Sequence, residues 1–367
     1  MKNSSSNRSN IIFWVISILL MSILFEILSS QILIYTYRSK QHNLGEFQGE
    51  ISSLSSINLI HKVAIKIGFS GINTGTVFKE KTDPAPFILQ DPVMGYSASA
   101  GEYTHTILRK YGSQKDWESF KTKVTINKDG SRWTGEIDGE NLPKIYVFGD
   151  SFVFGSGVND EQTFSFLLQY AMPHYEVKLY ALGGYSLTQA YLRFENLKES
   201  INSSDIIVLG YADFYDKRHV MSPSRVREGD STNERRLLES KNMSFSLLKA
   251  SLDKNGEIEH SYVNGNCSEN NGYCEKKDPS SSEMTNLTAA LINHISDNTK
   301  AKVYLIHFRG NYDNPVFELI NDKVTLVSAL SGDFDYFIQD SVEGFDPHPG
   351  PYWHYAISRK LLETLSD

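Results

Sequence analysis

Cysteine is scarce in this chain, and clustered positive charge is missing. Only two of the 367 residues are cysteines, which excludes a fold held together by many disulfides. The formal net charge is −8, and no basic run with interleaved aromatic residues occurs, which excludes a nucleic-acid partner. An internal repeat, a phosphate-binding Walker loop and a dinucleotide-binding glycine fingerprint are also absent, so we expect no cofactor. A hydrophobic content of 40% can still bury a sizeable core without a metal.

The two cysteines, Cys267 and Cys274, lie seven positions apart in a polar segment. A pair at this spacing can close a small surface loop as a disulfide, which persists only in an oxidising compartment. Two unrelated exposed thiols are the alternative, and a metal site is disfavoured because two further ligands are not evident nearby. The pair therefore favours an exported domain.

The N-terminus carries the longest apolar run. Residues 11–25 are apolar apart from Ser17 and Ser22, and the run resumes after Glu26. About 20 such residues span a bilayer, so we predict one uncleaved transmembrane helix. A secretory signal peptide is the competing interpretation, but the run is long and residues 28–30 match a cleavage site poorly. Positive charges flank both ends, so orientation is taken from the cysteines, with the C-terminal domain outside the cytoplasm.

Composition divides the chain into four segments. A predicted stalk is polar with short apolar stretches, and the segment after it alternates between polar and apolar residues in places, as at 121–126, which indicates paired strands. The predicted segments are a cytoplasmic tail and anchor at 1–37, the stalk at 38–84, a β-rich extension at 85–142 and the core domain at 143–367, which holds a polar insertion at about 214–282.

The core domain alternates between strand and helix patterns. Strands are expected at 144–148, 177–182, 206–209, 302–308 and 323–327, and helices at 163–172, 187–200, 283–296, 314–320 and 352–365. This rhythm predicts an α/β fold in three layers, with a five-stranded parallel sheet between helices. Sites in such folds form at the carboxyl ends of the strands, where Ser151, Gly184, Asp213 and His348 all fall.

A Gly-Asp-Ser turn, Gly149 to Ser151, follows the first of these strands directly. A serine delivered to a sheet edge by a buried strand can act as a nucleophile, and its own backbone N–H lies close to any carbonyl that the hydroxyl attacks. As a bare tripeptide, the motif is more often a surface turn.

Asp346 and His348 lie in a proline-rich segment just before the last predicted helix. Serine catalysis needs a base to take the serine proton and a carboxylate to hold that base in the right tautomer, and this segment supplies both. The alternative is a polar loop that caps the terminal helix.

Over residues 143–365 these two motifs, with their order and context, resemble the SGNH (GDSL) hydrolase family. The resemblance implies a flavodoxin-like fold in which Ser151 is the nucleophile, His348 the base and Asp346 its orienting acid. The segment 181–189 resembles the family's second motif, which implies that the Gly184 N–H binds the oxyanion together with the Ser151 N–H.

One family motif departs from the pattern. Its third motif should offer an asparagine after the next strand, but the chain has Ala212 followed by Asp213. The loss of one oxyanion donor can cost about two to three orders of magnitude in rate. We expect Asp213 or a neighbouring backbone N–H to take that place. Asp150 and His354 are further expected neighbours of the site, with His354 taken first as structural.

Other histidines are read as structural. His307 is expected to be a satisfied histidine at a strand end, and Arg218 with His219 a surface pair. The resemblance implies an esterase for an acylated small molecule or carbohydrate, with small acyl groups such as acetyl on a cell-surface glycan. Acyl transfer between glycans, and a non-enzymatic binding module with a decayed oxyanion hole, are the alternatives.

Overall fold

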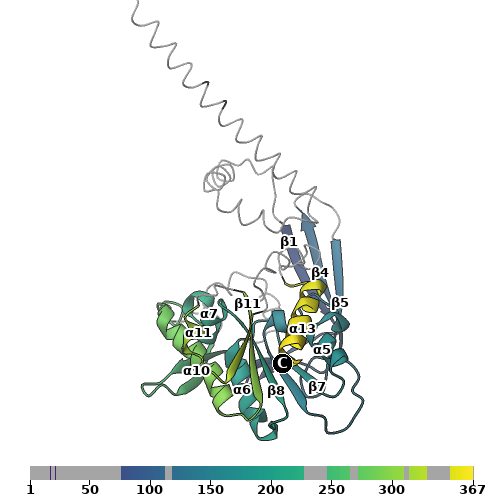
Figure 1. The fold of residues 1–367 in the computed structure, drawn as a ribbon. Helices are drawn as coiled ribbons and strands as arrows, with labels where there is room; N and C mark the ends of the chain where they lie inside the picture. Colours follow the sequence, from purple (N-terminus) through teal and green to yellow (C-terminus); the bar gives the residue numbers. More distant parts are fainter. Residues whose placement is uncertain are drawn as a thin grey trace, which may run out of the picture. The chain divides into compact units, whose positions relative to one another are not determined.

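The computed structural model describes residues 17, 21, 76–111, 118–226, 246–264, 272–309, 314–328 and 348–366 (Figure 1). The chain divides into two compact units, Met1–Asn73 and Thr74–Asp367, and the elements below all belong to the second. No helix within the described residues is long and apolar enough to cross a membrane. The predicted anchor lies outside them, apart from Ser17 and Met21, and stays a prediction.

A five-stranded, wholly parallel sheet forms the core, as the alternating pattern predicts. Neighbouring strands pair in the order β12-β11-β8-β6-β7, and each pair is parallel. The strands are β6 (Lys144–Gly149), β7 (Glu176–Ala181), β8 (Ile206–Ala212), β11 (Lys302–Arg309) and β12 (Val324–Ser328). Each overlaps its expected range. The central strands β6 and β8 are almost wholly buried and are therefore apolar runs, whereas the edge strand β7 retains half-buried residues.

Helices cover both faces of the sheet, which gives the expected three layers (Figure 1). Ile145 and Val147 of β6 pack on one side, while Tyr146 and Phe148 pack on the other, because side chains alternate along a strand. The first side carries α5 (Phe164–Ala171) and α13 (Pro351–Ser366), and the second carries α6 (Leu187–Leu197), α10 (Ser281–Asp297) and α11 (Val316–Leu319).

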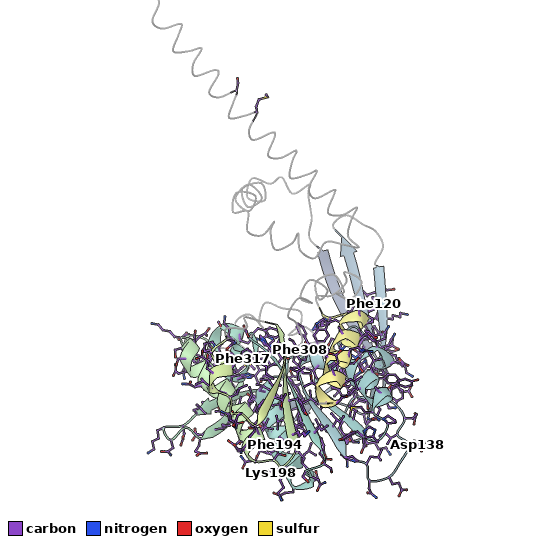
Figure 2. All side chains as sticks on the ribbon, in the orientation of Figure 1. Phe120, Asp138, Phe194, Lys198, Phe308 and Phe317 are labelled. Atoms are coloured by element: carbon purple, nitrogen blue, oxygen red, sulfur yellow. The ribbon has the colours of Figure 1, made fainter. Side chains whose placement is uncertain are left out.

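Side chains fill both spaces between sheet and helices (Figure 2). Phe308 packs on the side of the sheet that carries α5 and α13, and Phe194 packs on the opposite side. Both are fully buried. Short helices complete the unit: α4 (Ser151–Phe154), α7 (Tyr215–His219) and the 3-10 turns η1 (Asp160–Gln162) and η2 (Lys198–Ser200). Capping boxes at Ser186 and Ser280 set where α6 and α10 begin.

The extension before the core consists of strands. An antiparallel sheet in the order β1-β4-β5 contains β1 (Thr76–Asp83), β4 (Gly101–Tyr111) and β5 (Glu118–Ile126), and β2 (Ile88–Asp91) forms a hairpin with β3 (Gly95–Ala98). Strand β1 lies within the predicted stalk at 38–84, so the extension includes residues before the predicted boundary at 85. Its polar sequence hides it, because pairing with β4 rather than apolar content holds it as a strand.

Residues 132–134 join this extension to the core. The Arg132 N–H donates to the Leu179 carbonyl of β7 at 2.9 Å, and the Trp133 N–H donates to the Thr125 carbonyl of β5 at 2.9 Å. The buried Thr134 hydroxyl adds a bond of 2.8 Å to the Val177 carbonyl. Because β5 of the extension and β7 of the core both form hydrogen bonds with this short segment, the extension continues the edge of the parallel sheet.

The insertion at 214–282 contains an antiparallel hairpin of β9 (Ser246–Leu252) and β10 (Ile258–Asn264). Leu248 and Ala250 of β9 are buried in the two core clusters, so β9 packs against the core. Cys274 is buried with Met221 and Val226 and is not a free thiol. Its predicted partner, Cys267, lies outside the described residues, so their pairing stays a prediction.

Two fully buried histidines make folding of this unit dependent on pH. Burial, with the cation of Arg218 nearby, lowers the pKa of His219 from 6.5 to about 3. Burial also lowers the pKa of His354 to about 3, with Arg132 as the second cause. Below pH 6.5 the unfolded chain therefore binds more protons than the folded one, so stability falls as pH falls.

We expect His219→Leu to flatten this pH dependence. Each such histidine contributes about 1.4 kcal/mol per pH unit between about pH 6 and pH 4, and the variant removes one of them. Urea unfolding at pH 7, 6 and 5 measures the slope. His260→Leu, at an exposed position on β10, is the control and should keep the wild-type slope. Equal slopes in wild type and His219→Leu would show that folding leaves the pKa of His219 unchanged.

Candidate active site

Ser151 stands at the carboxyl end of β6, as the sequence predicts. The strand ends at Gly149, and Ser151 begins α4 with an exposed fraction of 7%. Asp150 caps the helix, because its carboxylate accepts the Phe152 N–H at 2.8 Å. The Ser151 hydroxyl lies 3.5 Å from the other oxygen of Asp150, a long contact that leaves its proton weakly held. The turn therefore presents a serine in a fixed position at the sheet edge.

Two glycines seat α4 tightly against the sheet. A Cβ on Gly149 would lie 2.2 Å from Val153 Cγ2, and one on Gly210 of β8 would lie 2.3 Å from the same atom. Val153 is fully buried between them. The role of Gly149 is thus to make room for the helix rather than to adopt an unusual backbone angle, and the second glycine that this packing needs is not evident from the sequence.

Arg218 neutralises the buried carboxylate next to Ser151. Its Nη1 donates to Asp150 Oδ2 at 2.8 Å, and Asp150 is fully buried. The guanidinium also lies over the Phe214 ring, 4.7 Å from its centroid. The sequence interpretation of Arg218 and His219 as a surface pair is wrong: His219 is fully buried and Arg218 is bound to the site. Asp150 thus serves to cap α4 and pair with Arg218.

His348 lies beside the turn that carries Ser151. Its ring centroid is 5.6 Å from that of Phe152, the residue after Ser151, in an edge-to-face arrangement. The Phe152 ring also meets the Phe214 ring with 5.6 Å between centroids, so Phe152 is flanked by Phe214 and His348. Nearly two hundred residues separate Ser151 from His348 in the chain, and the fold places the His348 ring against the residue that follows Ser151. A hydrogen bond between them stays a prediction, and Asp346 lies outside the described residues.

The contacts of His354 are those of a structural histidine rather than of a catalytic base. It is fully buried, its Nδ1 accepts the Phe164 N–H at 3.3 Å, and its ring stacks on Phe164. With its pKa lowered to about 3 by burial, it stays neutral and holds α13 to α5. His307 is likewise a satisfied histidine at a strand end, because its Nε2 lies 3.0 Å from Asp213 Oδ1.

The second motif forms a tight loop between β7 and α6. Gly184 has φ +79°, a left-handed conformation that favours glycine. Tyr185, the next residue, is buried, and Ser186 caps α6. The loop follows the strand beside β6, so Gly184 and Ser151 stand at the carboxyl ends of paired strands. This is the placement that an oxyanion site needs.

At the third motif, Ala212 is fully buried and Asp213 is engaged elsewhere. Asp213 Oδ1 accepts the Asn314 Nδ2 donor at 2.8 Å, in addition to its contact with His307. Asn314 also donates to the Tyr211 hydroxyl at 3.1 Å. These contacts direct that Asp213 oxygen toward β11, which lowers the repulsion that an ionised carboxylate would exert on an oxyanion.

No group of three or more metal-ligating side chains gathers anywhere in the described part of the chain. The residues that sequence reasoning missed are Arg218, Gly210 and Asn314. Each acts across the fold on a residue far away in sequence, so none of the three contacts has a local signal.

Comparison with solved structures finds proteins of low similarity, two of which are described as lipolytic or as a lipase. A member of the lipolytic G-D-S-L family from Veillonella parvula has 12% identity and a TM-score of 0.33, with 61% of this chain and 99% of that chain covered. A lipase from a goat rumen metagenome has 11% identity and a TM-score of 0.32, with coverages of 60% and 97%. A Bacillus subtilis protein has 12% identity and a TM-score of 0.36, with coverages of 80% and 90%.

No protein-family model matches the sequence, and no curated protein matches it significantly. Identities and scores of this size do not transfer an activity, so function is argued from the chain's own residues.

Proposed function

We propose that this protein is a serine esterase of SGNH type. The observation that carries the proposal is the meeting of the Ser151 turn with His348, whose ring packs on Phe152. Ser151 Oγ attacks the ester carbonyl carbon while His348 takes the serine proton, and the backbone N–H groups of Ser151 and Gly184 stabilise the oxyanion. Asp346 orients His348.

The reaction is completed in two stages. When the tetrahedral adduct collapses, the carbon–oxygen bond to the leaving alcohol breaks, and His348 gives its proton to that alcohol. Water, activated by His348, then attacks the acyl-serine, and the carboxylic acid leaves as Ser151 regains its proton. A sugar hydroxyl in place of water would make the protein an acyltransferase with the same residues.

The substrate we propose is an acylated small molecule or carbohydrate that carries a short acyl chain. The apolar rings of Phe152 and Phe214 next to the serine suit an acyl group, and the family resemblance favours acetyl. We also propose that the apolar N-terminal run anchors the protein in a membrane, with the esterase domain outside the cytoplasm and a disulfide between Cys267 and Cys274.

The binding-module alternative has one observation in its favour. Ala212 stands where the family carries an oxyanion-donating asparagine, and it is fully buried. Two backbone donors remain, however, and the loss of a third costs about two to three orders of magnitude, which leaves measurable catalysis.

Labelling with a fluorophosphonate separates an enzyme from a binding module. We expect the reagent to modify Ser151 in the full-length wild-type protein, because only an activated serine reacts with it. Peptide mapping should place the label on Ser151, and Ser156→Ala, a serine substitution just after α4, should label like wild type. Folded wild-type protein without a label would contradict the proposal. Product analysis with a sugar acceptor then distinguishes hydrolysis from acyl transfer.

A further inference from the structure

The extension reaches into the proposed oxyanion loop through one side chain, Tyr96 of β3. Its hydroxyl donates to the Gly183 carbonyl oxygen at 2.7 Å. The same oxygen atom of Tyr96 lies 2.6 Å from where a Cβ on Gly184 would stand. The Tyr96 hydroxyl therefore sits directly on the peptide unit between Gly183 and Gly184.

This peptide unit is the one that carries the Gly184 N–H. A trans peptide is planar, with its C=O and its N–H pointing in opposite directions, so a bond that fixes the Gly183 C=O also fixes the direction of the Gly184 N–H. A donor at the carbonyl also polarises the peptide, which strengthens its N–H as a donor. Neither effect requires Tyr96 to touch the substrate.

We propose that Tyr96 is a positioning residue that aims the Gly184 N–H at the oxyanion, so that the β-rich extension is part of the catalytic machinery. This inference rests on the proposed esterase function. It gives the extension, whose sequence indicates no role, a defined task in the reaction.

Tyr96 is itself held on several sides, as a positioning residue must be. The Tyr185 hydroxyl donates to the Tyr96 carbonyl at 2.6 Å, and the two rings lie 5.2 Å apart. Since Tyr185 follows Gly184 directly, contacts between the two tyrosines hold the loop and β3 together.

The turn of the β2–β3 hairpin is fixed as well. Asp91 Oδ1 accepts the backbone N–H groups of Val93 and Met94, each at 2.8 Å, and Met94 is buried in the core cluster. From the insertion hairpin, the Tyr262 hydroxyl lies 2.9 Å from the Pro92 carbonyl and 2.8 Å from that of Val93. Tyr185 of the loop, Asp91 of the β2–β3 hairpin and Tyr262 of the insertion hairpin thus together fix Tyr96 beside the loop.

Tyr96→Phe tests the proposal, because it removes the hydroxyl and keeps the ring and the backbone carbonyl that Tyr185 binds. We expect kcat for p-nitrophenyl acetate to fall about tenfold while KM changes less than about twofold, since an oxyanion donor acts in the transition state. The rate of fluorophosphonate labelling should fall in parallel. A side chain that only stabilised the fold would lower the active fraction without slowing the labelling of active protein.

Tyr180→Phe is the matched control. Its hydroxyl also donates to a residue before the core, Asp129 at 3.2 Å, and not to the Gly183 carbonyl. We expect its kcat to stay within about twofold of wild type. Equal losses in the two variants, or a Tyr96→Phe protein with a raised KM and unchanged kcat, would overturn the inference.

Gly184→Ala provides an independent check. The added methyl would collide with the Tyr96 hydroxyl, whereas the next ring atom, Tyr96 Cζ, is 3.9 Å away. Combining Gly184→Ala with Tyr96→Phe should therefore cost less than the product of the two single losses. Strictly multiplicative losses would contradict the placement of the hydroxyl.

An inactive wild type would contradict the proposed function and this inference together, whereas an active wild type with unchanged Tyr96→Phe kinetics overturns this inference alone.

Discussion

Ser151→Ala is expected to lower ester turnover by at least about a thousandfold, because the nucleophile and its base act as a unit. The serine is 7% exposed at the start of α4, so removal of its hydroxyl leaves the packing of Phe152 and Val153 intact. Hydrolysis of p-nitrophenyl acetate by full-length protein, with folding checked by circular dichroism, measures the loss. Ser156→Ala, as control, should remain close to wild type.

His348→Ala should reduce turnover to a similar extent, whereas His354→Ala should not. His354 is neutral and bound to the Phe164 N–H, so its loss should lower stability and leave the turnover of folded protein intact. Asp346→Asn should leave an intermediate remnant, because an orienting acid contributes less than the base that it holds. A folded His348→Ala protein with full turnover would show that another group removes the serine proton.

Arg132→Met is expected to cause the largest loss of stability. Arg132 is 1% exposed, and its Nε donates to Asp160 Oδ1 at 2.8 Å. The remaining guanidinium nitrogens donate to the carbonyls of Phe154, Gly155 and Val158, at 2.6, 2.9 and 2.8 Å. The side chain thus ties the extension to the end of the nucleophile helix.

The substitution would leave Asp160 as a buried charge and several carbonyls without their donor. Breaking a buried pair in this way costs about 3–5 kcal/mol, which is a large part of the stability of a domain. Urea unfolding followed by intrinsic fluorescence measures the change. Lys123→Met, which breaks an exposed pair with Glu102, is the control and should have little effect. A loss in Arg132→Met no larger than in Lys123→Met would show that the Arg132 contacts contribute little.

The parallel sheet follows from local sequence pattern. The central strands β6 and β8 are apolar runs of suitable length, and α5, α6 and α10 each begin at a side-chain cap, as at Ser186 before α6. The Gly-Asp-Ser turn is found for the same reason, since the end of β6 is visible where the apolar run stops. Ser151 and His348 can therefore be placed at one edge of the sheet by topology alone.

The contacts that complete the site have no local signal. Asp150 meets Arg218 across 68 residues, and Tyr96 meets Gly183 across 87, at distances that depend on how separate elements pack. Strand β1 was missed because its apolar residues are few and pairing with β4 makes it a strand. Pattern reasoning thus finds elements that bury themselves and misses side chains that act between elements.

Capture of the acyl-enzyme tests the central claim most directly. Full-length protein mixed with p-nitrophenyl acetate and quenched in acid within the first turnovers should carry one acetyl group, and peptide mapping should place it on Ser151. The adduct should be missing in Ser151→Ala. An acetyl group on another side chain, or turnover by wild type with Ser151 unmodified throughout, would contradict the account.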